Sequence, residues 1–167
     1  MSEAQTNSSE SSPHDFWMAR AWQAAARSNC IRRAVGAVLV RDGQIIAEGW
    51  NGVAGEYPDC RAAGCRRCIE GGATGSGYES CICIHAEQSA VAQAARNGIA
   101  TEGSSLYVNL RPCLQCLTLC LAAGVNRVFF AGDSWEYPSE VERIYCVLCD
   151  RLDEFARVDN SVAALED

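Results

Sequence analysis

Apolar and polar residues alternate along the chain with two different periods, which predict helices and strands in turn. Helical spacing of apolar residues marks four segments, at 15–29, 85–97, 112–123 and 139–155. Short apolar runs mark strands at 34–40, 44–50, 105–110, 125–132 and 155–158. Asp42-Gly43 predicts a tight hairpin between the first two strands, and Asp15 is a candidate N-cap of the first helix. This order predicts an α/β fold, a three-layer α/β/α domain around a mixed five-stranded sheet.

Segments without this periodicity set the expected limits of the domain. Residues 1–13 are polar and rich in serine, so we expect a disordered N-terminal tail, and we expect a frayed C-terminus at 161–167. The domain between them spans 14–160 and carries a cysteine-rich insertion at 53–84. His14 stands at the edge of the tail, where we expect a solvated side chain and not a metal ligand.

Charge and cysteine usage narrow the classes of function. A net charge of −7 without any run of arginine or lysine argues against binding a polynucleotide, whereas a mononucleotide needs only one or two arginines. No apolar run has transmembrane length, and the start lacks the basic and apolar regions of a signal peptide. Eleven cysteines without an export signal predict a reducing cytoplasm, with metal binding favoured over disulfides.

Two short motifs carry the clearest chemistry. His85-Ala86-Glu87 and Pro112-Cys113-Leu114-Gln115-Cys116 each stand at the start of a predicted helix. Cys113 and Cys116 are three residues apart and therefore share a helix face, and the positive end of the helix favours thiolates. The alternatives are a structural zinc site or two unrelated helices. Both halves occurring in order, each opening a helix, favour one joint site.

The residue types of these motifs suit a catalytic zinc ion. One imidazole and two thiolates, from His85, Cys113 and Cys116, leave a fourth tetrahedral position open for water, whose pKa then falls to about 7. Glu87 is not needed as a ligand, so we expect it to carry protons between water, a ring nitrogen and a leaving amine.

Other cysteines and one asparagine are further candidates. The segment 53–84 holds Cys60, Cys65, Cys68, Cys81 and Cys83, and a metal clip explains them better than free thiols, because such a loop buries little apolar surface. Cys146 and Cys149 lie on an apolar helical face, which favours core packing. Asn51 follows a strand within Gly49-Trp50-Asn51-Gly52, where a turn residue in a left-handed conformation and a substrate contact are equally compatible with the pattern.

With these residues placed, the chain resembles the cytidine deaminase superfamily, and most of all the deoxycytidylate (dCMP) deaminases. The resemblance covers about residues 15–138 and includes Ser28-Asn29-Cys30, the segment 49–52, the run IHAEQSA, AARNG and LYVNLRPC. It implies a cytidine-deaminase-like fold with zinc ligands at His85, Cys113 and Cys116. It also implies a proton shuttle at Glu87 and a substrate contact at Asn51.

The resemblance implies more about cofactors and partners. A second, structural zinc would use Cys30, Cys60, Cys81 and one of Cys65 or Cys68. Nucleotide effectors, dCTP and dTTP, would bind Gly49, Trp50, Asn51, Gly52 and Arg96. The implied activity is zinc-dependent hydrolysis of dCMP to dUMP and ammonia by a cytoplasmic homo-oligomer that binds neither a membrane nor a polynucleotide.

Departures from the family pattern keep other functions open. Trp50 stands where tyrosine is usual, Ser89 where asparagine is usual, and Arg111 where a small or acidic residue is usual. Arg111 is either a surface residue paired with a carboxylate or a substrate-binding residue for an anionic group. The alternatives are a deaminase of another pyrimidine nucleotide or nucleoside or of a purine base, a catalytically silent zinc-binding regulator, and a thiol redox or metal-buffering protein.

Overall fold

The computed structural model describes residues 12–71, 77–132 and 136–158. The predicted tail up to residue 11 and the predicted frayed end at 161–167 lie outside the described residues. Within the described ranges, no helix has the length and apolar content needed to cross a membrane.

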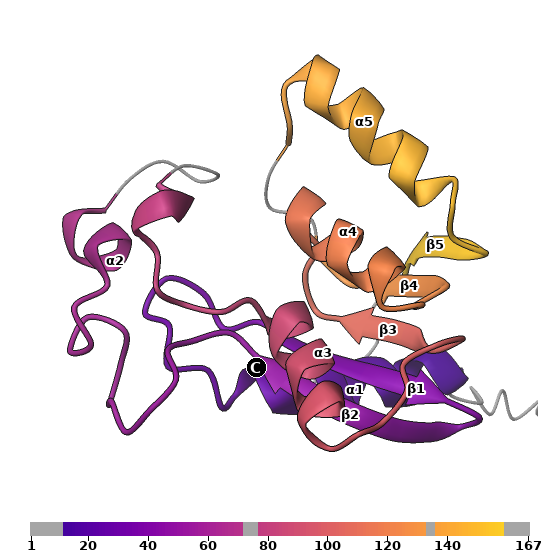
Figure 1. The fold of residues 1–167 in the computed structure, drawn as a ribbon, viewed down its shortest axis with the longest axis horizontal. Helices are drawn as coiled ribbons and strands as arrows, with labels where there is room; N and C mark the ends of the chain where they lie inside the picture. Colours follow the sequence, from indigo (N-terminus) through magenta and orange to yellow (C-terminus); the bar gives the residue numbers. More distant parts are fainter. Residues whose placement is uncertain (1–11, 72–76, 133–135, 159–167) are drawn as a thin grey trace, which may run out of the picture.

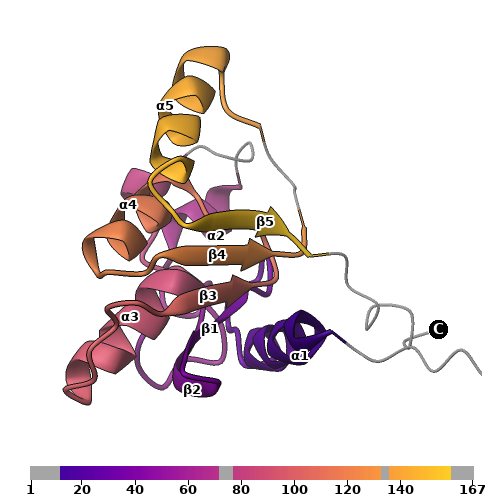
Figure 2. The same cartoon turned by 90° about the vertical axis from the view of Figure 1, so that its right-hand side faces the viewer.

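A mixed five-stranded sheet forms the centre of the domain, as predicted. Its strands are β1 (Gly36–Arg41), β2 (Gln44–Trp50), β3 (Ser105–Val108), β4 (Arg127–Phe130) and β5 (Glu154–Arg157). They lie in the order β2-β1-β3-β4-β5 (Figure 2), with β1 antiparallel to both β2 and β3, and with β4 parallel to both β3 and β5. The first two strands join through Asp42 and Gly43, both with positive φ, which confirms the predicted hairpin.

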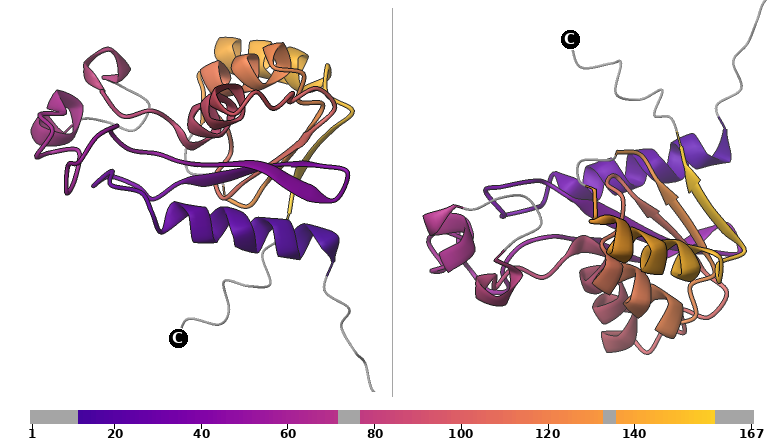
Figure 3. Two further views of the ribbon diagram at one scale, coloured as in Figure 1. Left: turned by 60° about the horizontal axis from the view of Figure 1, so that its bottom comes forward. Right: turned by 90° about the horizontal axis from the view of Figure 1, so that it is seen from above.

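Helices cover both faces of this sheet and complete the three layers. Helix α1 (Pro13–Ala25) lies on one face, and α3 (Ala86–Arg96), α4 (Leu114–Ala122) and α5 (Ser139–Cys149) lie on the other (Figures 1 and 3). Apolar side chains fill both interfaces between helices and sheet. Met18, Val38 and Phe129 lie between α1 and the sheet. Leu39, Leu106 and Leu117 lie on the opposite face, under α3 and α4. The layers therefore bury both faces of the central strands, which is why these strands read as continuous apolar runs.

Two glycines let helices approach the sheet closely. A Cβ added at Gly36 would overlap backbone atoms of Ala21 and Ala25 in α1, and one added at Gly49 would overlap backbone atoms of Ala86 and Ala90 in α3. The second approach matters for function, because α3 carries two of the predicted site residues at its start.

Helix α1 begins earlier than the sequence predicts. Ser12 is its N-cap: its hydroxyl accepts a hydrogen bond from the His14 amide, and the carboxylate of Asp15 accepts one from the Ser12 amide. The prediction of Asp15 as the N-cap was therefore wrong, because Ser12 caps the helix and Asp15 is the N3 residue of the same capping box. The prediction of a solvated His14 side chain was also wrong, because its Nδ1 lies 3.0 Å from the Tyr107 hydroxyl and its ring packs against Phe129.

Residues 53–71 and 77–84 leave the sheet and form a separate cysteine-rich lobe (Figure 1). Its described parts contain one short helix, α2 (Arg66–Glu70), and one 3₁₀ turn, η1 (Tyr78–Ser80). Backbone hydrogen bonds between Gly52 and Ile84 close its base.

Two cysteines of helix α5 differ in burial. Cys149 packs against the core but Cys146 is exposed, so the predicted core role of Cys146 was wrong.

Candidate metal centre and active site

The starts of α3 and α4 bring the predicted metal ligands together. His85 and Cys113 are the N-cap residues of these two helices, both with extended backbone, and Cys116 lies one turn into α4. Because α4 follows β3 directly, its N-terminus lies at the carboxyl end of a central strand, where sites of α/β sheets usually form. Two positive helix ends thus point at one place, which favours negatively charged ligands there.

The distances between these three side chains fit a zinc ion. His85 Nδ1 lies 3.5 Å from Cys113 Sγ and 3.4 Å from Cys116 Sγ, and the three ligand atoms all lie within 4.8 Å of one another. Tetrahedral zinc with ordinary Zn–N and Zn–S bonds separates its ligand atoms by about 3.6 to 3.8 Å. The residues present therefore match the group that the sequence predicts, with one coordination position left for water.

Hydrogen bonding within this triad prepares one thiolate. A hydrogen bond from Cys116 lowers the pKa of the Cys113 thiol to about 4, with a further contribution from His85, although burial opposes it. The hydrogen bond between His85 and Cys113 raises the pKa of the His85 imidazole above its usual value. A thiolate at Cys113 is the form that binds a metal ion.

Glu87 lies in the first turn of α3, beside the ligands, and is only 4% exposed. Burial, together with the charge of Cys113, raises the pKa of its carboxyl to about 7. A carboxyl with a pKa near neutrality exchanges its proton readily, as a general acid and base must. Its position next to His85, Cys113 and Cys116 agrees with the role that the sequence predicts for it.

The pocket over this site is strongly basic although the chain as a whole is acidic. His85, Glu87 and Cys113 form one part of its wall, and four arginines form another: Arg32, Arg33, Arg67 and Arg111. The first two follow Cys30 in the turn before β1, and Arg67 comes from the lobe. Four guanidinium groups around one small pocket favour an anionic ligand.

Asn51 lies in the wall of the pocket, and three hydrogen bonds hold its side chain. Its Oδ1 accepts bonds from Ser28 Oγ at 2.7 Å and from the Val35 amide at 2.8 Å, and its Nδ2 donates to the Arg33 carbonyl at 2.8 Å. Its φ is not positive, so the interpretation as a left-handed turn residue was wrong. Asn51 instead holds the turn that carries Arg33, and its contact with substrate stays a prediction.

Arg111 joins the pocket to helix α5. Its guanidinium lies 2.5 Å from Glu142 Oε1 and 4.2 Å from the centre of the Tyr145 ring, and it also lines the pocket. Both interpretations offered by the sequence therefore describe part of its surroundings, because Arg111 is paired with a carboxylate and faces the site.

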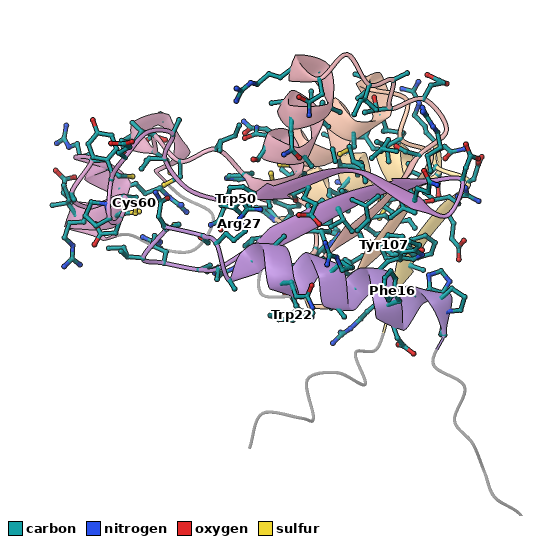
Figure 4. All side chains as sticks on the ribbon, turned by 90° about the horizontal axis from the view of Figure 1, so that it is seen from below. Phe16, Trp22, Arg27, Trp50, Cys60 and Tyr107 are labelled. Atoms are coloured by element: carbon teal, nitrogen blue, oxygen red, sulfur yellow. The ribbon has the colours of Figure 1, made fainter. Side chains whose placement is uncertain are left out.

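The residues expected to bind effectors lie along β2 and α3. Arg27 stacks on the ring of Trp50 at 3.6 Å (Figure 4), and Gly49 packs against the first turns of α3. Arg96 is exposed in the last turn of α3, about 15 Å along the helix axis from Ala86. Effector binding by this set stays a prediction.

The cysteines of the lobe gather around Cys30 in a second cluster. Cys30, Cys60, Cys68 and Cys83 have sulfur atoms within 4.8 Å of one another, and so do Cys65, Cys81 and Cys83. The ligand set implied by resemblance is thus divided, because Cys81 groups with Cys65 and not with Cys30 and Cys60. Cys83, which that set left out, belongs to both groups.

Sequence reasoning missed several residues of the site. Arg32, Arg33 and Arg67 line the pocket, yet only their position next to Cys30 and Cys68 marks them in the sequence. Cys83 was noted among the cysteines of the insertion, and its spacing of two from Cys81 gave no reason to prefer either as a ligand. In both cases the signal is proximity to a cysteine that is itself a candidate ligand.

An α/β/α domain with a histidine, two cysteines and a buried glutamate at paired helix starts defines a zinc-dependent deaminase fold. Residues 11–132 match the family model described as "Cytidine and deoxycytidylate deaminase zinc-binding region". The chain therefore belongs to the cytidine and deoxycytidylate deaminase family.

Known relatives and structures agree with this assignment. The chain is 36% identical to deoxycytidylate deaminase of Schizosaccharomyces pombe over 88% of its own length and 45% of the relative's. It is 34% identical to deoxycytidylate deaminase of Mycobacterium phage D29 over 72% of its own length and 94% of the relative's. Its fold matches the dCMP deaminase of cyanophage S-TIM5 with a TM-score of 0.63 at 24% identity, over 87% of this chain and 96% of that one. The chain thus spans less than half of the yeast relative.

Proposed function

We propose that the protein is a hydrolytic deaminase that converts dCMP and water to dUMP and ammonia. The deoxycytidylate deaminases among its relatives and the geometry around Glu87 support this proposal. The observation that carries it is the position of Arg32, Arg33, Arg67 and Arg111 around the pocket that holds Glu87 and His85. A nucleoside or a free base has no anionic group for these arginines to bind, whereas a mononucleotide carries its 5′-phosphate.

His85, Cys113 and Cys116 would hold the zinc ion of the family. When bound, zinc lowers the pKa of water to about 7 and so makes hydrolysis possible at neutral pH. Cys113 enters this site as a thiolate, and the hydrogen bonds within the triad fix the orientation of the His85 ring. The closeness of the three ligand atoms supports their binding one zinc ion.

Glu87 would move the protons of the reaction. Its carboxylate accepts a proton from the attacking water and delivers it to N3 of the cytosine ring, which makes C4 more electrophilic. Once the water oxygen is bonded to C4, Glu87 takes the second proton of that water and passes it to the amino group, and the C4–N bond breaks to release ammonia. Burial suits this role, because a carboxyl whose pKa is raised to about 7 holds and releases a proton with equal ease near neutral pH.

The arginines would hold the phosphate and thereby fix the base over Glu87. Such contacts act on the whole substrate, so their removal should weaken binding more than it slows the chemical step. Asn51 supports this arrangement, because its amide holds the turn of Arg33 in place. Direct contact of Asn51 with the sugar is part of the proposal.

An ammonia-release assay tests this function. The full chain, loaded with zinc, is offered dCMP, CMP, deoxycytidine, cytosine, guanine and adenine at equal concentrations. We expect dCMP to be turned over with the highest kcat/KM and deoxycytidine at least about tenfold less efficiently, because it lacks the charged contact. Equal turnover of dCMP and deoxycytidine, or the highest activity on a base, would refute the nucleotide assignment, and no release of ammonia from any substrate would favour a silent regulator.

Arg67→Ala separates the phosphate contact from general damage to the fold. We expect its KM for dCMP to rise with little change in kcat, and its kinetics on deoxycytidine to stay close to those of the unmodified protein. Arg143→Ala is the matched control, because Arg143 is exposed on α5 and is not among the residues that line the pocket. Unchanged KM for dCMP in Arg67→Ala would remove Arg67 from the phosphate site.

We also propose a structural zinc site formed by Cys30 and cysteines of the lobe. The close sulfur atoms of Cys30, Cys60, Cys68 and Cys83 support it, and so does the free state of all eleven cysteines of the chain. Free thiols in this number require a reducing compartment, which supports a cytoplasmic location.

Regulation and assembly complete the proposal. The match of Gly49–Gly52 and Arg96 to the family's effector motifs supports control by dCTP and dTTP in a homo-oligomer. Size-exclusion chromatography coupled to light scattering, with and without each nucleotide, tests this point. A monomer whose rate responds to neither nucleotide would refute it.

A further inference from the structure

The cysteine-rich lobe buries cysteines and exposes its larger apolar side chains, which is the reverse of an ordinary hydrophobic core. Among its described residues, the buried cluster consists of cysteines, with Val53 as the one aliphatic residue packed against it. The larger apolar side chains of the lobe are instead exposed: Tyr57 by 49%, Ile69 by 53% and Ile82 by 54%. Sulfur atoms gather around Cys60 in the interior (Figure 4). Such a core stabilises the lobe well only when the sulfurs bind metal.

Cys83 lies at the centre of these sulfur atoms. It belongs to the group Cys30, Cys60, Cys68 and Cys83 and also to the group Cys65, Cys81 and Cys83. Its Sγ therefore lies within 4.8 Å of the sulfur of all five other cysteines. A sulfur with this position can bind two metal ions at once.

Cys68 belongs to the first group only and reaches the second through one contact. Its thiol contacts Cys65 of the second group as well as Cys60. Cys65 in turn lies 4.0 Å from Cys81, so the second group is as compact as one metal requires. The six sulfurs thus form two outer pairs, Cys30 with Cys60 and Cys65 with Cys81, on either side of Cys68 and Cys83.

Two tetrahedral zinc ions need eight zinc–sulfur bonds, which six cysteines provide when two of them bridge. We propose that the lobe holds a binuclear zinc cluster in which Cys68 and Cys83 bridge the two ions, Cys30 and Cys60 complete one, and Cys65 and Cys81 complete the other. This inference rests on the proposed structural zinc site and adds a second ion to it, so the chain would hold three zinc ions in all.

Backbone amides around the cluster favour the thiolate form of three of its cysteines, and nearby arginines supply positive charge. The Ile31 amide donates to Cys60 Sγ at 3.4 Å, the amides of Arg32 and Arg33 donate to Cys30, and those of Ile82 and Cys68 donate to Cys65. Two zinc ions and six thiolates carry a net charge of −2, the same as one ion with four thiolates. Five arginines stand within three residues of these cysteines and offset this charge: Arg32, Arg33, Arg61, Arg66 and Arg67.

The competing arrangement is a single zinc ion. It would bind Cys30, Cys60, Cys68 and Cys83 and leave Cys65 and Cys81 as a pair of thiols. The two arrangements differ in the number of zinc ions and in the state of this pair, and both quantities can be measured without an activity assay.

Native mass spectrometry of the full chain, purified in the presence of zinc, counts the ions directly. We expect three zinc ions per chain, and two in His85→Ala, which loses only the ion at the start of α3. One ion in His85→Ala, with Cys65 and Cys81 open to thiol titration, would overturn the binuclear cluster and leave the single structural zinc. No zinc in that variant would overturn both. Deamination of dCMP is measured separately, so failure of the proposed activity does not affect this count.

Cadmium and serine variants test the bridges. With ¹¹³Cd in place of zinc, the two lobe ions should give resonances that split each other through the shared sulfurs, and absence of this splitting would overturn the proposal. Cys65→Ser combined with Cys81→Ser should remove one lobe ion, whereas Cys146→Ser, which changes an exposed cysteine elsewhere, should remove none. If the double variant does not fold, the ion count and the ¹¹³Cd splitting of the unmodified chain still decide.

Discussion

Glu87 combines a buried position beside the metal ligands with a carboxyl pKa near neutrality, as a proton carrier requires. Glu87→Gln keeps the size of the side chain but cannot carry a proton, so we expect kcat for dCMP to fall by at least ~10²- to 10⁴-fold. Zinc content and thermal unfolding should stay close to those of the unmodified protein, because Glu87 is not one of the ligands. Activity within a few-fold of the unmodified protein would remove Glu87 from the mechanism.

Arg111 is a residue with two sets of contacts, and kinetics can separate them. If it binds the phosphate, Arg111→Ala should raise KM for dCMP by roughly 10- to 100-fold, the value of one charged hydrogen bond, with a much smaller fall in kcat. The penalty should shrink for deoxycytidine, which lacks the phosphate.

Glu142→Gln provides the comparison, because it breaks the ion pair with Arg111 but leaves the guanidinium in place. We expect it to change KM much less than Arg111→Ala does. Equal losses on dCMP and deoxycytidine in Arg111→Ala would assign the residue a purely structural role between the site and α5.

At this scale the sequence predicted residues whose spacing is fixed by local structure. His85 with Glu87, and Cys113 with Cys116, lie within single helical turns, so the motif alone brings each pair together. Arg32, Arg33 and Arg67 enter the pocket from a turn and from the lobe, and no local period connects them with His85. Their convergence depends on tertiary packing, which the sequence pattern does not encode.

Helix and strand positions followed from periodicity, but their ends did not. Strand β2 (Gln44–Trp50) was predicted at its observed limits, since a hairpin turn fixes one end and Gly52 follows the other. Helix α1 starts earlier and α5 ends earlier than expected, because capping by Ser12 and the bend after Cys149 act on single residues. Apolar periodicity indicates which face of a helix is buried, but it does not indicate where the helix is capped.

The contact between β2 and α3 is the element-level feature that holds His85 and Glu87 in place. Gly49→Ala introduces a methyl group that overlaps the backbone of Ala86 and Ala90. We expect the free energy of unfolding to fall by about 1 to 3 kcal/mol, as overpacking usually costs. Because α3 must also shift away from β2, kcat should fall with it.

Gly132→Ala is the matched control for this change. Its added Cβ meets only the Asn109 carbonyl at 3.3 Å and Leu110 at 3.6 Å, and its φ is not in the left-handed region. Chemical denaturation of both variants compares them directly. If Gly49→Ala were as stable as Gly132→Ala, close packing of α3 on β2 would not be what fixes the site.

The whole molecule consists of a layered domain stabilised by apolar burial and a lobe whose interior is sulfur. Cys60→Ser should therefore lower zinc content and the midpoint of thermal unfolding together. Cys120→Ser is the control, because Cys120 is equally buried but lies in the apolar core under α4. We expect it to keep its full zinc content, measured by elemental analysis. Full zinc content in Cys60→Ser would separate the lobe from metal binding.

The order of elements predicted the architecture of the whole molecule, because alternating strands and helices have few ways to bury both faces of a sheet. The same reasoning found the cysteine-rich insertion but not its interior. Six cysteines spread between Cys30 and Cys83 allow many groupings, and only the path of the chain around α2 decides which sulfurs meet. Overall charge was similarly uninformative, since an acidic chain here surrounds a basic pocket.

Cys30 belongs to the sulfur cluster and, together with Arg32 and Arg33, to the wall of the pocket. Effects of two ligands on each other's binding through such a shared turn are reciprocal. If lobe zinc tightens the binding of a nucleotide in the pocket, the nucleotide must tighten the binding of lobe zinc by the same factor, and dialysis against a chelator with and without dCMP measures that factor. With a factor above one, molecules without a nucleotide would lose the lobe metal first in a cell short of zinc, and those that hold a nucleotide would keep it longest.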